Sequence, residues 1–524
     1  MRKSDSTQKV PLSFKRALLV ATASLALGIL WDILFYDKLV GISFPIFIVV
    51  GLATALVSAR AGRVSIPRPA LLMAIPLLFF SVMIFVRADG FIAFLDSIAS
   101  LYLVLLCLYM VYRPDLHLYV LRDYVALPFR QVAAYAAHAR STLATVAGVR
   151  SFVRKHEHFP HIVRGIVIAV PVLLLFIALF SSADLVFRHY AADLFNIHID
   201  GNFLRQALLC LIVAFMACGA LTYLLRPSLT GAPARSGETS KGFALGRVEM
   251  AILFGSLNVL FVLFIVVQLA YLFGGERNVL GQGFTYAEYA RKGFFELIAV
   301  AVVSFLLLWF AEKSSQRLAA RHPRPFQWLS AALIVQVLVI MVSAFKRLAL
   351  YENAYGFTDL RFYSHVAIIW LAVVFCFLLY KILRSAPEYT FARLLFFSAL
   401  AALVFVNVVN VDAFVARKNI ARYQATHKLD VQYIQSLSDD AIPATVQLLH
   451  APDPHLRTAY AGVLYAKQQR LISKEHAWQS KNLGREAALR ILNEQGDVLR
   501  QNRDQRLEYI VSPVYTSPAS DPSQ

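Results

Sequence analysis

Acidic and basic side chains alternate at helical spacing between residues 286 and 296. Glu288 and Arg291 are one helical turn apart, and Glu296 follows little more than a turn later. A carboxylate beside a guanidinium can act as a general base at a reaction site, or it can form a charge-assisted ion pair that holds two helices together. These residues are therefore candidates for chemistry or for structural pairing, and the sequence leaves both open.

Arginine and tyrosine combine in a second segment. Arg347, Tyr351 and Tyr355 recur every four residues, so they share one face if the chain is helical there. Arg361 lies a short distance further along the chain. Because guanidinium groups match phosphate oxygens, Arg347 and Arg361 could hold a phosphate-bearing ligand, with a carboxylate of the first segment as the base.

A third polar group, Asn410 and Asp412, lies at the outer end of the last long apolar block of the chain. Together with the two segments above it completes the predicted polar cluster, which consists of Glu288, Arg291, Glu296, Arg347, Tyr351, Tyr355, Arg361, Asn410 and Asp412. The same side chains could instead pin helices to one another where they leave a membrane.

Standard catalytic and cofactor motifs are absent from the sequence. There is no Gly-x-Ser-x-Gly, no HExxH and no phosphate-binding loop, so we expect no cofactor. The cysteines all fall inside apolar blocks, which argues against a disulfide framework or a zinc site. His156, His158 and His161 lie beside basic residues without a cysteine, and we interpret them as a solvated cluster at a membrane surface rather than a metal site.

The elements that position these residues are apolar helices. The chain is 58% hydrophobic and only 16% charged, whereas soluble domains carry about 25% charged residues. Its apolar residues form blocks of about 18–24, long enough to cross about 30 Å of hydrocarbon, where only helices satisfy every backbone group of a single segment. We expect an all-α polytopic transmembrane helix bundle with eleven spans, at roughly 17–36, 39–58, 69–87, 91–112, 164–183, 205–225, 249–272, 293–311, 328–346, 364–384 and 394–412.

Basic residues orient these spans. Several precede the first span without a cleavage site, and Lys and Arg are concentrated in the connections on that same side. This predicts a cytoplasmic N-terminus (1–16), a bundle over 17–412 in the bacterial plasma membrane, and an extracytoplasmic C-terminus. The net charge of +19 comes largely from the ends of the apolar blocks, so a nucleic-acid partner is not expected. Glu312, near an inner end, is expected to reach the cytoplasmic headgroups.

The cytoplasmic connection from 113 to 163 is long and basic. Its apolar residues recur at helical spacing, and the expected stripe consists of Val132, Tyr135, Ala139, Leu143, Val146 and Phe152. A basic amphipathic helix of this kind could lie on the anionic lipids of the inner leaflet. It could also pack against the underside of the bundle, and the sequence does not choose between the two.

The chain becomes polar and helical after Asp412. Residues 413–510 are predicted to form an extracytoplasmic helical domain, available to a protein partner, and 511–524 a disordered tail. Helix starts are expected near Asp440 and at Asp453. The apolar stripe expected in this domain consists of Leu448, Leu449, Leu456, Tyr460, Val463 and Leu464.

Several segments resemble an uncharacterised family of bacterial membrane proteins, the group known as domain of unknown function 4153/4173. The segments are FIVVQLAYLFGG (264–275), TYAEYARKGFFE (285–296), YENAYGFTDLR (351–361), VNVDAFVARKNIARY (409–423) and LDVQYIQSLSDDAIP (429–443). The resemblance runs from the first span to about residue 495 and is densest from 262 to 443. It implies a polytopic plasma-membrane protein and brings no reaction or ligand with it.

Three functions are compatible with these features. The first is a non-enzymatic sensor, scaffold or assembly protein, which the lack of a catalytic motif favours. The second is a transporter or flippase that uses the outer polar cluster in a substrate path. The third is an outer-leaflet membrane transferase acting on a phosphate-containing, lipid-linked donor.

Overall fold

The structure is a computed structural model that describes residues 12–115, 118–148, 201–226, 246–273, 294–316, 324–473 and 477–502. Within these ranges every regular element is a helix. Ten of the helices in these ranges are long and apolar enough to cross a membrane. The protein is therefore an all-α polytopic membrane protein.

The ten long helices match predicted spans. They are α1 (Phe14–Phe35), α2 (Ser43–Ala61), α3 (Arg68–Val86), α4 (Gly90–Met110), α9 (Gly201–Leu225), α10 (Arg247–Phe273), α13 (Phe294–Gln316), α14 (Arg324–Tyr355), α15 (Asp359–Arg384) and α16 (Glu388–Val409). The remaining predicted span, 164–183, lies outside the described residues, as do the histidine triplet and the tail from 511.

The C-terminal ends of two of these helices bear on the predicted polar cluster. Helix α14 continues to Tyr355, well past the predicted end at 346, so Arg347, Tyr351 and Tyr355 do lie on one continuous helix. Helix α16 ends at Val409 because Asn410 adopts a left-handed conformation, with φ of 53°. Asparagine tolerates this conformation better than most residues, and here it turns the chain into the next helix.

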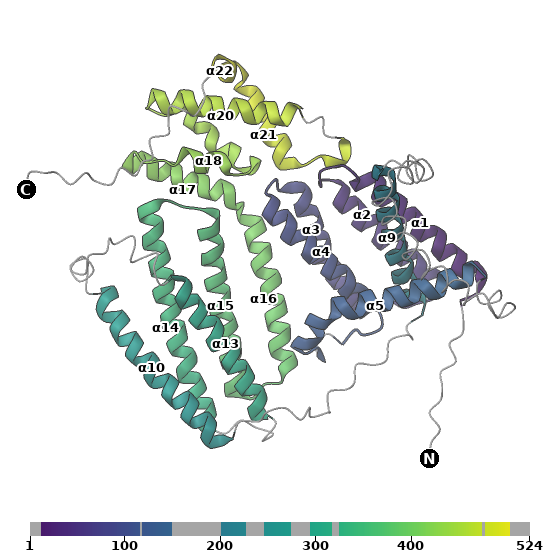
Figure 1. Ribbon diagram of the computed structural model, residues 1–524, viewed down its shortest axis with the longest axis horizontal. Helices are drawn as coiled ribbons and strands as arrows, with labels where there is room; N and C mark the ends of the chain where they lie inside the picture. Colours follow the sequence, from purple (N-terminus) through teal and green to yellow (C-terminus); the bar gives the residue numbers. More distant parts are fainter. Residues whose placement is uncertain are drawn as a thin grey trace, which may run out of the picture.

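The bundle consists of two halves joined by α16 (Figure 1). Helices α1 to α4 and α9 pack in one half, with α2 to α4 and α9 around buried side chains such as Leu77 and Phe80, and α1 on α9 around Val20 and Leu221. Helices α10 and α13 to α15 pack in the other, around Val337 and Phe375. The adjacent residues Phe391 and Ala392 of α16 belong to the second and the first of these cores respectively, so α16 connects them inside the bundle.

Helix α5 (Leu121–Val146) runs across the ends of the first half, on the side away from the C-terminal helices (Figure 1). It packs closely on α9, where a Cβ at Gly219 would lie 2.1 Å from the Tyr135 carbonyl oxygen. The predicted stripe does not lie on one face, because Tyr135 and Ala139 are buried whereas Val132 and Leu143 are 48% and 42% exposed, and Phe152 lies outside the described residues. The buried face is rotated from it and includes Leu127, together with residues of mixed polarity that hydropathy alone does not select.

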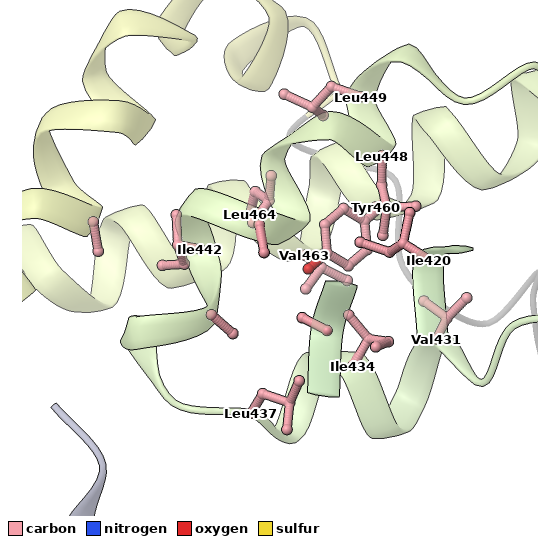
Figure 2. Close-up of a cluster of buried hydrophobic side chains, with 14 of the residues drawn as sticks. Ile420, Val431, Ile434, Leu437, Ile442, Leu448, Leu449, Tyr460, Val463 and Leu464 are labelled. Atoms are coloured by element: carbon pink, nitrogen blue, oxygen red, sulfur yellow. The ribbon is translucent and has the colours of Figure 1, made fainter. Parts of the chain in front are cut away.

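The C-terminal helices form a further core beyond α16, which also includes Ile92 of α4 and Val406 of α16. They are α17 (Val411–Thr426), α18 (Val431–Ser436), η2 (Asp439–Ala441), α19 (Ile442–Thr445), η3 (Val446–His450), α20 (Pro454–Ser473), η4 (Trp478–Ser480), α21 (Leu483–Glu494) and α22 (Gly496–Gln501). All six residues of the stripe expected here are buried, and Figure 2 shows Tyr460 at the centre of the core with Ile420, Ile434 and Leu464 around it. We call this unit the C-terminal domain. The end of the bundle that this domain covers is called the domain end.

Candidate functional site at the domain end

The predicted polar cluster is divided between separate places in the structure. Glu288 and Arg291 lie outside the described residues. Glu296 lies in the first turn of α13 and is exposed. The other members are all at the domain end, but they face three different neighbourhoods.

Arg347 holds two long helices together. Its guanidinium Nη2 donates to Gln268 Oε1 on α10 at 2.8 Å, and the Ser343 hydroxyl donates to the same oxygen at 3.1 Å. The arginine is only 6% exposed. The Arg347 guanidinium connects α14 to α10, which is the arrangement expected if this arginine holds helices together.

Arg361 and Tyr351 do meet. The Arg361 guanidinium lies over the Tyr351 ring at 4.2 Å from its centroid and also donates to the Gly356 carbonyl. The Tyr355 ring packs on Tyr351 at 4.7 Å. Arg361 and Tyr351 line a pocket of about 440 Å³, which we call the membrane-side pocket. Its walls also include Phe294, Phe295, Leu348, Thr358, Asp359, Leu360, Ser364 and Tyr433.

Asn410 and Asp412 lie where α16 ends and the C-terminal domain begins. The Asn410 side chain caps α17 by accepting from the Ala413 amide at 3.2 Å. The Asp412 carboxylate accepts from the Ser438 amide at 2.7 Å, and burial raises the pKa of this carboxyl. Both residues position the chain at the start of the C-terminal domain, and neither lines the membrane-side pocket.

A further set of polar contacts at the domain end joins the C-terminal domain to the loop between α3 and α4. Asp440 Oδ2 accepts from the Ala88 amide at 2.9 Å. Asn482 Nδ2 donates to the Arg87 carbonyl at 2.7 Å and to the Ile84 carbonyl at 3.1 Å. Asn482 is 2% exposed, so its amide replaces water at the end of α3.

The loop between α1 and α2 is held in the same way. The Ile42 amide donates to the Lys481 carbonyl at 2.9 Å, and the Gln479 side chain donates to the Ile33 carbonyl at 3.2 Å. A Cβ at Gly41 would lie 2.2 Å from the Lys481 carbonyl oxygen. Only glycine therefore allows the two backbones to approach this closely.

The loop between α14 and α15 contacts the C-terminal domain from the other half of the bundle. The Asn419 side chain donates to the Phe357 carbonyl and accepts from the Phe357 amide, both at 2.8 Å. Beside it, the Tyr433 hydroxyl donates to Asp359 Oδ1 at 2.9 Å. We call the contacts of the C-terminal domain with these three loops (36–42, 87–89 and 356–359) the seam.

Sequence reasoning missed most of the seam. Asp440 was expected as a helix start, and Gln479 and Asn482 carried no signal because a single polar residue in a loop predicts nothing about its partner. Buried carboxylates are the clearest chemical feature of the seam, since burial raises the pKa of Asp440 from 3.8 to about 6. Among the described residues, no group of three or more His, Cys, Asp or Glu side chains is arranged to hold a metal ion.

A comparison with known families assigns most of this arrangement to one family. The family model described as "Domain of unknown function (DUF4153)" matches residues 74–448. The chain belongs to this family. The DUF4153 match begins within α3 and ends in η3, so it includes Ala88, Asp359, Asp412 and Asp440, while Asn482 lies beyond it. No curated protein and no solved structure matches the chain.

Proposed function

We propose that this DUF4153 protein is a non-enzymatic sensor or scaffold of the plasma membrane, in which the C-terminal domain couples the two halves of the bundle. The observation that carries the proposal is the seam. The buried side chains of Asn482 and Asp440 form hydrogen bonds with the first half, and that of Asn419 forms hydrogen bonds with the second half. A unit bound to both halves stabilises one relative placement of them and responds when that placement changes.

The proposal includes the orientation of the chain. The concentration of Lys and Arg at the opposite end supports an extracytoplasmic C-terminal domain. In a variant whose four cysteines are replaced, Ser436→Cys in the C-terminal domain should label from outside intact cells. Ser65→Cys, exposed between α2 and α3, should label only after permeabilisation. The reverse pattern would place the C-terminal domain in the cytoplasm.

A rescue experiment tests the coupling function. Cells lacking the protein are screened for an envelope-stress growth defect and complemented with wild type, with the seam variant Asn419→Ala/Asn482→Ala, or with Asn502→Ala. Within the described residues, the Asn502 side chain donates to the Val498 carbonyl of the adjacent helix α22 and makes no other hydrogen bond, so Asn502 is a matched control. We expect the seam variant to fail at wild-type protein level and the control to rescue. Full rescue by the seam variant would contradict the coupling function.

A second candidate function, transport or flipping of an anionic lipid, is favoured by the membrane-side pocket. Arg361 faces a wall that includes Phe295 and Leu360, which are 69% and 67% exposed and would contact lipid in a membrane. A cation beside an apolar wall suits a phosphate headgroup with its acyl chains. Native mass spectrometry should detect a phospholipid retained by the wild type and by Arg417→Ala, an exposed arginine of α17, and lost from Arg361→Ala. Equal retention in all three would remove this candidate.

A further inference from the structure

A cleft of about 640 Å³ lies between the C-terminal domain and the loops of the first half of the bundle. Leu39 and Ala88 come from the loops α1–α2 and α3–α4. The rest of the lining comes from the C-terminal domain and consists of Gln432, Gln435, Ser436, Leu437, Ser438, Asp439, Arg470, Leu471 and Arg485. Its volume falls within the range of about 300–1,000 Å³ typical of small-molecule sites, which often occur between domains.

The charges in the lining are not balanced. Arg470 forms an ion pair with Asp439 at 2.7 Å. Arg485 has no ion-pair partner within 4.0 Å in the described part of the chain, and its Nη1 atom is buried without a hydrogen bond. Two guanidinium groups line the cleft together with one carboxylate, Asp439, which is paired with Arg470, and Asp440 outside the lining also attracts Arg485. A buried donor without a hydrogen-bond partner is unfavourable, and an anion at the Arg485 guanidinium would relieve this once the side chain shifts toward the cleft.

Arg485 is held in place by the seam. Its backbone amide donates to Asn482 Oδ1 at 3.1 Å, which caps α21, and Asn482 in turn donates to the Arg87 and Ile84 carbonyls. The position of the guanidinium therefore depends on the docking of the C-terminal domain onto α3. Asp440, which also acts electrostatically on Arg485, is bonded to the Ala88 amide.

We propose that this cleft binds a small organic or inorganic anion, through a carboxylate or phosphate group held by Arg485 and Arg470. Guanidinium forks match both groups, and the amides of Gln432 and Gln435 and the hydroxyls of Ser436 and Ser438 add neutral hydrogen-bonding partners. Leu39, Leu437 and Leu471 accommodate a short carbon skeleton.

The proposed anion site rests on the proposed sensor function and adds the ligand that would be sensed. An anion in the cleft touches the C-terminal domain and two loops of the bundle together, so it binds the docked arrangement better than a separated one. By linkage, the ligand strengthens docking by the same free energy by which docking strengthens ligand binding. The anion would then be the signal that the C-terminal domain conveys to the bundle.

The test uses the purified full-length protein in detergent with two probes, inorganic phosphate and citrate, against sodium chloride at matched ionic strength. Thermal unfolding and isothermal titration calorimetry are measured for wild type, Arg485→Gln, Arg470→Gln and Arg490→Gln. Arg490 lies on the same helix α21, is exposed and is outside the cleft lining, so it is the matched control. Elution volume and intrinsic fluorescence verify that each variant is folded.

We expect at least one probe to raise the Tm of the wild type saturably. Its Kd should rise at least tenfold in Arg485→Gln, rise less in the half-exposed Arg470→Gln, and stay unchanged in Arg490→Gln. A phosphate-only response identifies a phosphate ligand and a citrate-only response a carboxylate ligand. No saturable response to either probe, or equal losses in Arg485→Gln and Arg490→Gln, would overturn the proposal. Because this assay requires no cell, its outcome is independent of the rescue experiment that tests the coupling function.

Discussion

Asp440 makes the seam sensitive to pH because its carboxyl is buried against the Ala88 amide. Burial raises its pKa from 3.8 to about 6. The folded protein therefore binds this proton more readily than the unfolded chain, so the contribution of Asp440 to stability is greatest below about pH 4 and declines as pH rises to about 6. The pKa of Asp412 is shifted in the same direction by burial, which adds to the trend.

The first prediction follows from that sign. Other acidic groups will impose their own pH dependence, so the informative quantity is the difference between wild type and Asp440→Asn. As pH falls from 7 to 4, the wild type should gain stability relative to Asp440→Asn, measured as Tm in detergent. Parallel pH profiles for the two proteins would contradict the raised pKa of this carboxyl.

Gly356 is a second residue whose identity matters to the seam. Its φ is +89°, and a Cβ there would lie 2.7 Å from Asn419 Oδ1, the atom that accepts from the Phe357 amide. We predict that Gly356→Ala lowers the free energy of unfolding by about 1–3 kcal/mol, since both the backbone and the amide pair are strained. Gly51→Ala is the matched control, because nothing lies within 4 Å of a Cβ there.

The control variant Gly51→Ala also has an expected effect on stability. Gly51 lies in α2, where alanine is the better helix former by about 0.5–1 kcal/mol, so this variant should be as stable as wild type or slightly more stable. Thermal unfolding of both variants by intrinsic fluorescence checks the pair. If both substitutions had the same small effect, the close approach of Asn419 to Gly356 would be unimportant for stability.

At the scale of elements, a buried ion pair joins α13 to α15. Lys381 Nζ lies 2.8 Å from Glu312 Oε2, and both side chains are 1% exposed. The expectation that Glu312 reaches the headgroups was wrong. Its side chain is buried, and Lys381 of α15 provides a partner inside the bundle. Sequence alone could not reveal this pairing, since the two residues lie 69 positions apart.

The pair yields the third prediction. Lys381→Met should destabilise the bundle by about 3–5 kcal/mol, because it leaves the Glu312 carboxylate buried without its cation. The double variant Lys381→Met/Glu312→Leu should recover most of that loss, because two apolar side chains of similar size carry no desolvation penalty. A double-mutant cycle on Tm measures the coupling, and additive losses would argue against a direct ion pair.

Helix α5 is compatible with both sequence-based interpretations. One face packs on the bundle, while Val125, Phe129 and Val132 form an exposed apolar stripe at helical spacing, flanked by the exposed Arg122 and Arg140. This outward face has the composition of a helix that lies at the surface of an anionic leaflet. The contact with anionic lipid remains a proposal.

The fourth prediction tests that contact. Exchanging zwitterionic for anionic nanodiscs should raise the Tm of the wild type, and Arg122→Gln/Arg140→Gln should lose much of the gain, since each arginine contributes about 1 kcal/mol near an anionic surface. Arg417→Gln/Arg490→Gln, exposed in the C-terminal domain, should keep it. A gain that is identical in all three proteins would place the lipid contact elsewhere.

At the scale of the whole molecule, α16 and the C-terminal domain connect two half-bundles that have separate cores (Figure 1). Inside the bundle the connection is α16, and at the domain end it is the seam. If the C-terminal domain docks as one unit, weakening one contact should loosen the others.

The fifth prediction measures this cooperation by hydrogen exchange. Asn482→Ala should accelerate amide exchange in the α3–α4 loop, which it contacts, and also at Phe357, which it does not contact. Asn502→Ala should change neither. Acceleration confined to the α3–α4 loop would mean that the three loops are held independently.

The sequence by itself determined the all-α polytopic class, ten of the described helices and the buried stripe around Tyr460. These features follow from the length and period of apolar segments, which the chain carries locally. Only the tertiary structure decided which polar groups meet. Asp440 and Ala88 lie 352 residues apart, and Arg361 shares a pocket with Tyr351 but not with Asp412. Hydropathy reports the environment that a residue prefers, whereas its neighbours depend on how distant helices pack.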